Sequence, residues 1–155
     1  LTTEFTKIEC VNQRPEILHV KCNINRTSKN ISALYGELKF SEEVSNLDGN
    51  YFVGVEYNKN FINYTTAKLD YCAALHMAQS QTLIQIVAVG LRSVSNFPHN
   101  CPFKKSYNYF VKGFTMDPKI VPVYMPGISF VTNATFFYNK RALFYVSCFG
   151  HFWKK

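Results

Sequence analysis

The sequence is poor in charged residues and lacks the motifs of familiar catalytic sites. Charged residues fill 17% of the 155 positions and hydrophobic residues 47%, the opposite of the balance found in disordered chains. Neither Gly-x-Ser-x-Gly nor His-Glu-x-x-His occurs. The adjacent acids Glu42 and Glu43 lie beside a predicted turn, where a solvated pair is the usual outcome. We therefore expect a folded binding protein and not an enzyme.

Long hydrophobic runs and clustered metal ligands are also absent. The longest apolar stretch, residues 83–91, is nine residues long and contains Gln85, whereas a membrane-spanning helix needs about 20 residues. The four histidines are scattered singly, and no two cysteines have the spacing of a zinc knuckle. We expect no metal and no cofactor. Residues 1–4 lack the character of a secretory leader, so we interpret the chain as the mature form of a secreted domain.

Acidic residues are nearly missing from the last third of the chain. The net charge is +7, and residues 1–100 contribute nine basic and nine acidic residues. Residues 101–155 carry Asp117 alone against eight basic residues, which are Lys104, Lys105, Lys112, Lys119, Lys140, Arg141, Lys154 and Lys155. One explanation is an ordinary solubilising surface. The other is an anionic partner, such as a lipid headgroup, a membrane surface or an acidic glycan. Nucleic acid is disfavoured because no recognition motif is present.

Cysteines and glycosylation sequons are what the chain does contain. Five cysteines indicate an oxidising compartment and at least one unpaired thiol. Four Asn-x-Ser/Thr triplets predict glycosylation of a secreted protein at Asn25, Asn30, Asn63 and Asn133.

Most of the chain alternates apolar and polar residues in the manner of β-strands. Residues 128–138 give the clearest example, with Phe130, Thr132 and Phe136 on one face and Asn133 on the other. We read residues 47–50 as a turn, and residues 117–127, which carry three prolines, as an extended edge segment. The other predicted strands are residues 3–10, 17–25, 32–40, 51–57, 61–69, 107–116 and 142–152. This pattern predicts a single all-β domain over residues 1–155, an antiparallel sandwich.

Residues 71–93 depart from the strand pattern. Leu83, Ile86, Val87 and Gly90 recur at helical spacing, and helix formers follow Cys72. The pattern predicts one helix near residues 72–93. A buried strand over residues 84–89 stays an alternative, because that run is rich in β-branched residues.

Several short segments together resemble one family. They are Phe5-Thr6-Lys7-Ile8-Glu9-Cys10, Asn25-Arg26-Thr27 after a second cysteine, Cys72 before a helix, His99-Asn100-Cys101-Pro102-Phe103, and Pro122-x-x-x-Pro126-Gly127 before a strand. The chain resembles, over essentially its whole length, the insect family of small secreted proteins in the ML lipid-recognition superfamily. This family includes the CheB-type chemosensory proteins, and the ganglioside activator protein is a more distant relative.

The resemblance implies an immunoglobulin-like β-sandwich whose sheets part around an apolar cavity. It implies a Cys72–Cys101 disulfide, and it leaves the pairing of Cys10 open between Cys22 and Cys148. The helical region is more apolar here than in familiar members, which is compatible with a cavity filled by side chains.

We expect a secreted protein that binds a lipid or other hydrophobic small molecule, with a role in chemosensation or reproduction by analogy. The predicted lining is Phe40, Phe52, Val53, Val55, Leu75, Ile86, Phe110, Phe114, Phe130, Phe136, Tyr138, Phe144 and Val146. Each of these could instead be ordinary core. At the mouth of the cavity, Lys104, Lys105, Lys140 and Arg141 are expected to contact an anionic headgroup or membrane. The alternative is a filled sandwich that binds another protein, such as a receptor, with an unpaired cysteine able to form an intermolecular bridge.

Overall fold

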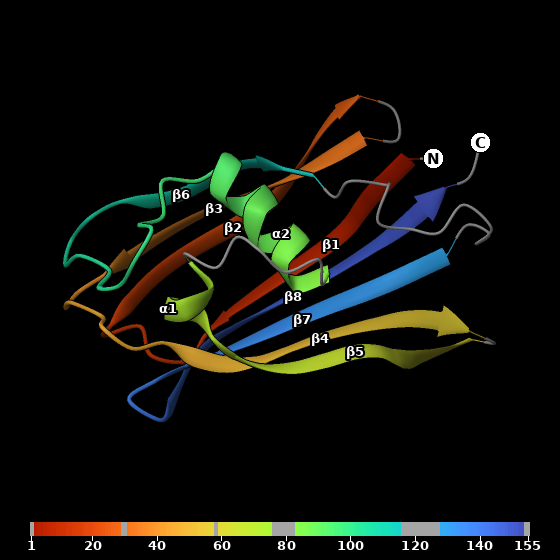
Figure 1. The fold of residues 1–155 in the computed structure, drawn as a ribbon. Helices are drawn as coiled ribbons and strands as arrows, with labels where there is room; N and C mark the ends of the chain where they lie inside the picture. The colour runs from red at the N-terminus through yellow and green to blue at the C-terminus, as the bar shows by residue number, and fades with distance from the viewer. Residues whose placement is uncertain (1, 29–30, 58, 76–82, 116–127, 154–155) are drawn as a thin grey trace.

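The protein is a two-layer antiparallel β-sandwich (Figure 1). The structure, a computed structural model, describes residues 2–28, 31–57, 59–75, 83–115 and 128–153. The strands are β1 (Thr2–Asn12), β2 (Leu18–Ser28), β3 (Ile31–Phe40), β4 (Asp48–Tyr57), β5 (Asn60–Asp70), β6 (Tyr109–Phe114), β7 (Ile128–Tyr138) and β8 (Arg141–Trp153). The helices are α1 (Tyr71–Ala74) and α2 (Leu83–Ser93). The predicted all-β sandwich is confirmed.

The two layers have five and three strands. The larger sheet has the order β1-β8-β7-β4-β5 and the smaller the order β2-β3-β6. Every pairing between named strands is antiparallel. At one edge of the sandwich β1 passes against β2, and the Cys10–Cys22 disulfide joins these two strands across the layers. This bridge resolves the pairing that the sequence left open, and Cys148 is the unpaired cysteine.

Helices α1 and α2 lie along the opposite edge, between the layers (Figure 1). The predicted single helix is wrong in its extent: α1 ends at Ala74 and α2 begins at Leu83, and residues 76–82 lie outside the described ranges. Asp70 caps α1, because its carboxylate accepts a bond from the backbone N–H of Ala73 at 3.2 Å. No described helix has the length and apolar character needed to cross a membrane. The expected Cys72–Cys101 disulfide is present and ties α1 to the loop before β6.

The turn predicted at residues 47–50 is wrong, because β4 begins at Asp48. Gly49 lies within the sheet, where it pairs with Leu69 on one side and Phe136 on the other. A Cβ atom at Gly49 would stand 1.8 Å from the carbonyl oxygen of Thr135. The glycine therefore permits a close approach of β4 and β7 rather than a change of chain direction. The predicted edge segment 117–127 lies outside the described residues.

The buried side chains form two separate clusters. One, at the end of the sandwich that holds the β7–β8 turn, contains Ile17, Leu18, Phe40, Val44, Leu47, Phe103, Tyr109, Tyr138, Leu143 and Phe144. The other, at the opposite end, contains Phe5, Phe114, Phe130, Cys148 and Phe152. Hydrophobic burial therefore holds the two layers together at both ends.

Candidate functional site

An apolar cavity of about 330 Å³ lies between the sheets and is partly open to the surface. Its walls include residues of both buried clusters, such as Phe40 and Phe144 from one and Phe114 and Cys148 from the other. The cavity therefore occupies the middle of the sandwich, between two packed ends. Its volume falls at the lower end of the roughly 300–1,000 Å³ range of small-molecule sites.

Aromatic rings form much of one wall. The rings of Phe136 and Phe144 stack with centroids 4.2 Å apart, and Tyr71 stacks on Phe136 at 4.3 Å. The Tyr71 hydroxyl donates to the backbone oxygens of Asn50 at 3.2 Å and Thr135 at 3.1 Å. These two acceptors anchor the ring at the start of α1 and leave its apolar face to the cavity.

Gly36 is the reason that the opposite wall is open. It lies in the middle of β3, on the inner face between Leu34 and Leu38, and opposite Cys22 of β2. A Cβ atom at this position would meet the Lys21 backbone oxygen at an ordinary contact distance of 3.5 Å. The backbone at position 36 tolerates a side chain. Because glycine has none, the space beside it stays part of the cavity, and a larger residue would fill that space.

Three lining groups that could ionise are held neutral. One is the Tyr71 hydroxyl, whose pKa burial raises well above its usual value. Burial raises the pKa of the Cys148 thiol to about 12. Burial also raises the pKa of the Tyr51 hydroxyl to about 12, and the neighbouring Cys148 contributes to that shift. Near neutral pH this part of the wall is uncharged, which suits an apolar ligand.

Three of the lining residues carry charge. Lys21 and Glu37 are exposed and lie directly opposite each other in the β2–β3 register. Arg92 comes from α2 and is half-buried. Arg92 was not among the predicted site residues, because in the sequence it is an isolated cation in an apolar helix.

The structure places seven of the predicted lining residues around the cavity: Phe40, Leu75, Phe110, Phe114, Phe136, Phe144 and Val146. The side chain of Ile86 lies outside the described part of the structure. Tyr71 and Gly36 were missed. Tyr71 lies at the start of the predicted helical region, and Gly36 has no side chain that could indicate contact with a ligand.

Five predicted lining residues lie elsewhere. Phe52 lies on the outer face of the large sheet, where its ring packs over Gly54 of the same strand. Val53 and Val55 follow Tyr51 along the inner face of β4, beyond the cavity. Phe130 packs into one end cluster, with its ring 4.7 Å from that of Phe152. Strand periodicity gives the face of a residue but not its position along the sandwich.

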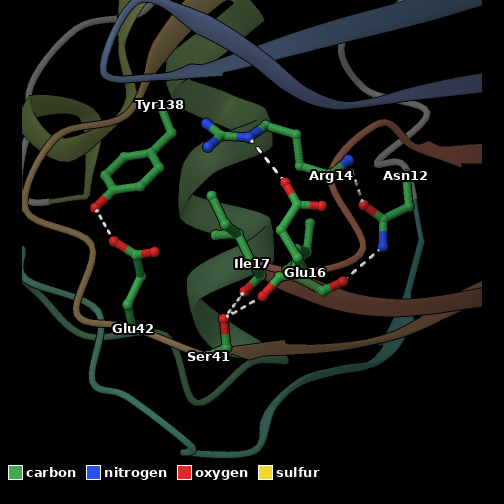
Figure 2. Close-up of polar contacts among 8 residues, drawn as sticks. Asn12, Arg14, Glu16, Ile17, Ser41, Glu42 and Tyr138 are labelled. Atoms are coloured by element: carbon green, nitrogen blue, oxygen red, sulfur yellow. Dashed lines mark hydrogen bonds and ion pairs between the residues drawn. The ribbon is translucent and has the colours of Figure 1, made fainter.

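Tyr138 is the fifth residue, and it belongs to the end of the sandwich (Figure 2). Its hydroxyl donates to Oε2 of Glu42 at 2.8 Å. This hydrogen bond and partial burial raise the pKa of Tyr138. Nearby, the Ser41 hydroxyl donates to the backbone oxygens of Glu16 at 2.7 Å and Ile17 at 3.2 Å (Figure 2). These hydrogen bonds cover this end of the sandwich with polar groups.

The cations predicted at the mouth do not line the cavity. Lys104 and Lys105 follow the buried Phe103, and Lys140 and Arg141 occupy the β7–β8 turn. All four are exposed at the end of the sandwich. The prediction of their place at the mouth is wrong, because none of the four is among the residues that surround the cavity.

The predicted glycosylation sites differ in exposure. Asn25 and Asn63 are exposed, whereas Asn133 is half-buried and its Oδ1 has no hydrogen-bond partner among the described residues. Asn30 lies outside the described residues. The strand positions of Asn25 and Asn63 leave room for a glycan on each side chain.

One family model matches the chain. It covers residues 48–132, more than half of the 155 residues, and its description is "Protein of unknown function (DUF1091)". The match contains the Cys72–Cys101 disulfide, both helices and strands from each layer. A comparison with curated proteins finds no match.

Proposed function

The chain belongs to the DUF1091 family of proteins of unknown function, and we propose that it is a secreted protein that binds a lipid or another hydrophobic small molecule between its sheets. The observation that carries this proposal is the cavity, which separates two well-packed cores. Protein interiors normally pack with few voids larger than a water molecule. An apolar space of this size destabilises a domain unless a ligand fills it.

The expected ligand is short. At about 30 Å³ per carbon, roughly the share of one water molecule in the liquid, a cavity of about 330 Å³ has room for at least about ten carbons. Burial of ten methylenes would contribute about 8 kcal/mol before the costs of ordering. A gain of about 8 kcal/mol corresponds to a dissociation constant of about 1 μM, and these costs make the expected affinity weaker than that limit.

Secretion is part of this proposal. Two disulfides are typical of oxidising compartments, and Asn25 and Asn63 are exposed enough to carry glycans. The finer assignment, to the insect branch of the ML superfamily with its chemosensory members, is also proposed here. It is supported by the resemblance of the cysteine-containing segments and by the cavity between two sheets.

The rival role was a filled sandwich that binds a protein partner, with an intermolecular disulfide as one route. The central cavity does not favour a filled core. The unpaired Cys148 is 4% exposed and lines the interior, so it is not accessible for a bridge between folded chains.

Filling the cavity tests the proposal. We expect wild-type protein to bind the neutral dye N-phenyl-1-naphthylamine, with enhanced fluorescence, and 1-decanol to displace it. Gly36→Leu places an isobutyl group in the cavity and should abolish both effects. The control is Lys39→Leu, which adds the same side chain to the outer face of the same strand. Native mass spectrometry of the purified protein would detect a retained ligand.

Circular dichroism shows that each variant folds before it is compared. If Gly36→Leu is folded and binds dye and decanol as the wild type does, the cavity is not the binding site and the proposal fails.

A further inference from the structure

We propose that the cavity takes an amphiphile with an anionic headgroup, a carboxylate or a sulfate, and that Arg92 pairs with that headgroup. The inference rests on the proposed function, because it assigns the polar end of the same ligand. It moves the headgroup contact from the exposed cations at the end of the sandwich to a helical residue in the cavity wall.

The position of Arg92 on α2 places it at the rim. Val87 and Leu91, four residues apart, lie on one helical face, line the cavity and pack against the cluster of Phe114 and Phe130. Arg92 follows Leu91 and is therefore rotated about 100° from it around the helix axis. Its side chain lines the cavity at the border of this apolar face and is half-buried.

Arg92 has no anionic partner in the described part of the protein. The ion pairs found there are Lys7–Glu9 and Arg14–Glu16. The other two charged lining residues, Lys21 and Glu37, alternate with the inner pair Cys22 and Gly36, so their side chains stand opposite each other on the outer face of the small sheet. Among the lining residues that the structure describes, Arg92 is thus the one whose charge faces the cavity without a counter-charge.

A half-buried guanidinium in the wall of an apolar cavity has lost part of its hydration, and no described residue replaces it. A carboxylate or sulfate oxygen restores those hydrogen bonds, and the planar guanidinium suits a two-point contact with either group. An alkyl tail of about ten carbons would then fill the space beside Gly36 and the Phe136 ring. The wall therefore fits an anionic medium-chain amphiphile better than a neutral one.

Three ligands of equal chain length test this inference: decanoate, decyl sulfate and 1-decanol, each below its micelle concentration. They displace N-phenyl-1-naphthylamine from the wild type, Arg92→Gln and Arg92→Lys. We expect the wild type to bind decanoate or decyl sulfate about 10- to 100-fold more tightly than decanol, the usual range for a hydrogen bond to a charged group. The tighter of the two anions identifies the headgroup.

Arg92→Gln should remove the preference for an anion over decanol, and Arg92→Lys should keep part of that preference. The matched control is Lys112→Gln, which removes one positive charge from the exposed outer face of the small sheet. We expect this control to behave as the wild type.

The possible failures are distinguishable. If decanol binds the wild type as tightly as both anions, or if Arg92→Gln retains the preference, the headgroup inference is overturned while the proposed function stands. If the dye and all three ligands fail to bind the wild type, the proposed function itself fails.

Discussion

The surroundings of Cys148 determine the ionisation and reactivity of its thiol. Its thiol lines the cavity, is almost fully buried and has a pKa raised to about 12. The neighbouring Phe5, Phe114 and Phe130 rings belong to the same cluster. The reactive form of cysteine is the thiolate, and burial in neutral form keeps this cysteine unreactive.

The raised pKa of Cys148 predicts a loss of stability in alkaline solution. In the unfolded chain this thiol ionises near its ordinary pKa of about 8.5, whereas the folded protein keeps the proton up to about pH 12. Between these values the folded state binds more protons, so the free energy of unfolding falls as pH rises, by up to about 1.4 kcal/mol per pH unit. Urea denaturation at several pH values from 7.5 to 9.8 measures this slope.

Cys148→Ala is the matched variant for that experiment. Its absolute stability is expected to be lower, but its slope between pH 8.5 and 9.8 should be shallower than in the wild type. The buried tyrosines Tyr51 and Tyr71, whose pKa values are also raised, add to the slope in both proteins. Equal slopes for the two proteins would contradict the assigned burial of the thiol.

At the scale of elements, two disulfides hold the edges of the sandwich. Cys10–Cys22 joins β1 to β2, and Cys72–Cys101 joins α1 to the loop before β6. The first closes one edge by direct contact of strands. The second secures the helical edge, where Tyr71 and Leu75 line the cavity.

Removal of the Cys72–Cys101 bridge should therefore destabilise the fold. The double variant Cys72→Ala/Cys101→Ala frees a loop with a sequence separation of 29, which corresponds to about 3–4 kcal/mol of unfolding free energy. Cys10→Ala/Cys22→Ala, with a separation of 12, should lose slightly less, about 3 kcal/mol. Guanidinium titration measures both. A loss below 1 kcal/mol in the first variant would show that the bridge does not constrain the unfolded chain as argued.

For the whole molecule, net charge is the property most directly linked to a partner. Lys104, Lys105, Lys140 and Arg141 collect at one end of the sandwich, although they come from distant parts of the sequence. Glu42 lies at the same end and offsets part of this charge, as its contact with Tyr138 shows. Attraction to an anionic surface is therefore expected to be weak and sensitive to salt.

Replacement of these four residues by Gln tests that expectation. Binding to vesicles with 30% phosphatidylserine in low salt should fall at least several-fold in the variant, because each cation close to such a surface contributes about 1 kcal/mol. Sedimentation of vesicles with bound protein provides the measurement, and neutral vesicles are the control. Unchanged binding would mean that this end of the molecule does not face the membrane.

The local pattern of the sequence determined the layers and their faces. Alternation along residues 128–138 placed Thr132 and Phe136 inside and Asn133 outside, as the structure has them. The Cys72–Cys101 pairing followed from a resemblance and is present. These features depend on short-range periodicity or on a family pattern, and a single chain carries both.

Only the tertiary structure decided where along each strand the cavity lies. Phe130 and Phe136 share one inner face, yet the first fills an end cluster and the second lines the cavity. Gly36 and Arg92 came together with these rings because two sheets and a helix, remote in sequence, meet around one space. Periodicity specifies which side of a strand is buried, whereas packing between elements determines whether a neighbour or an empty volume lies on that side.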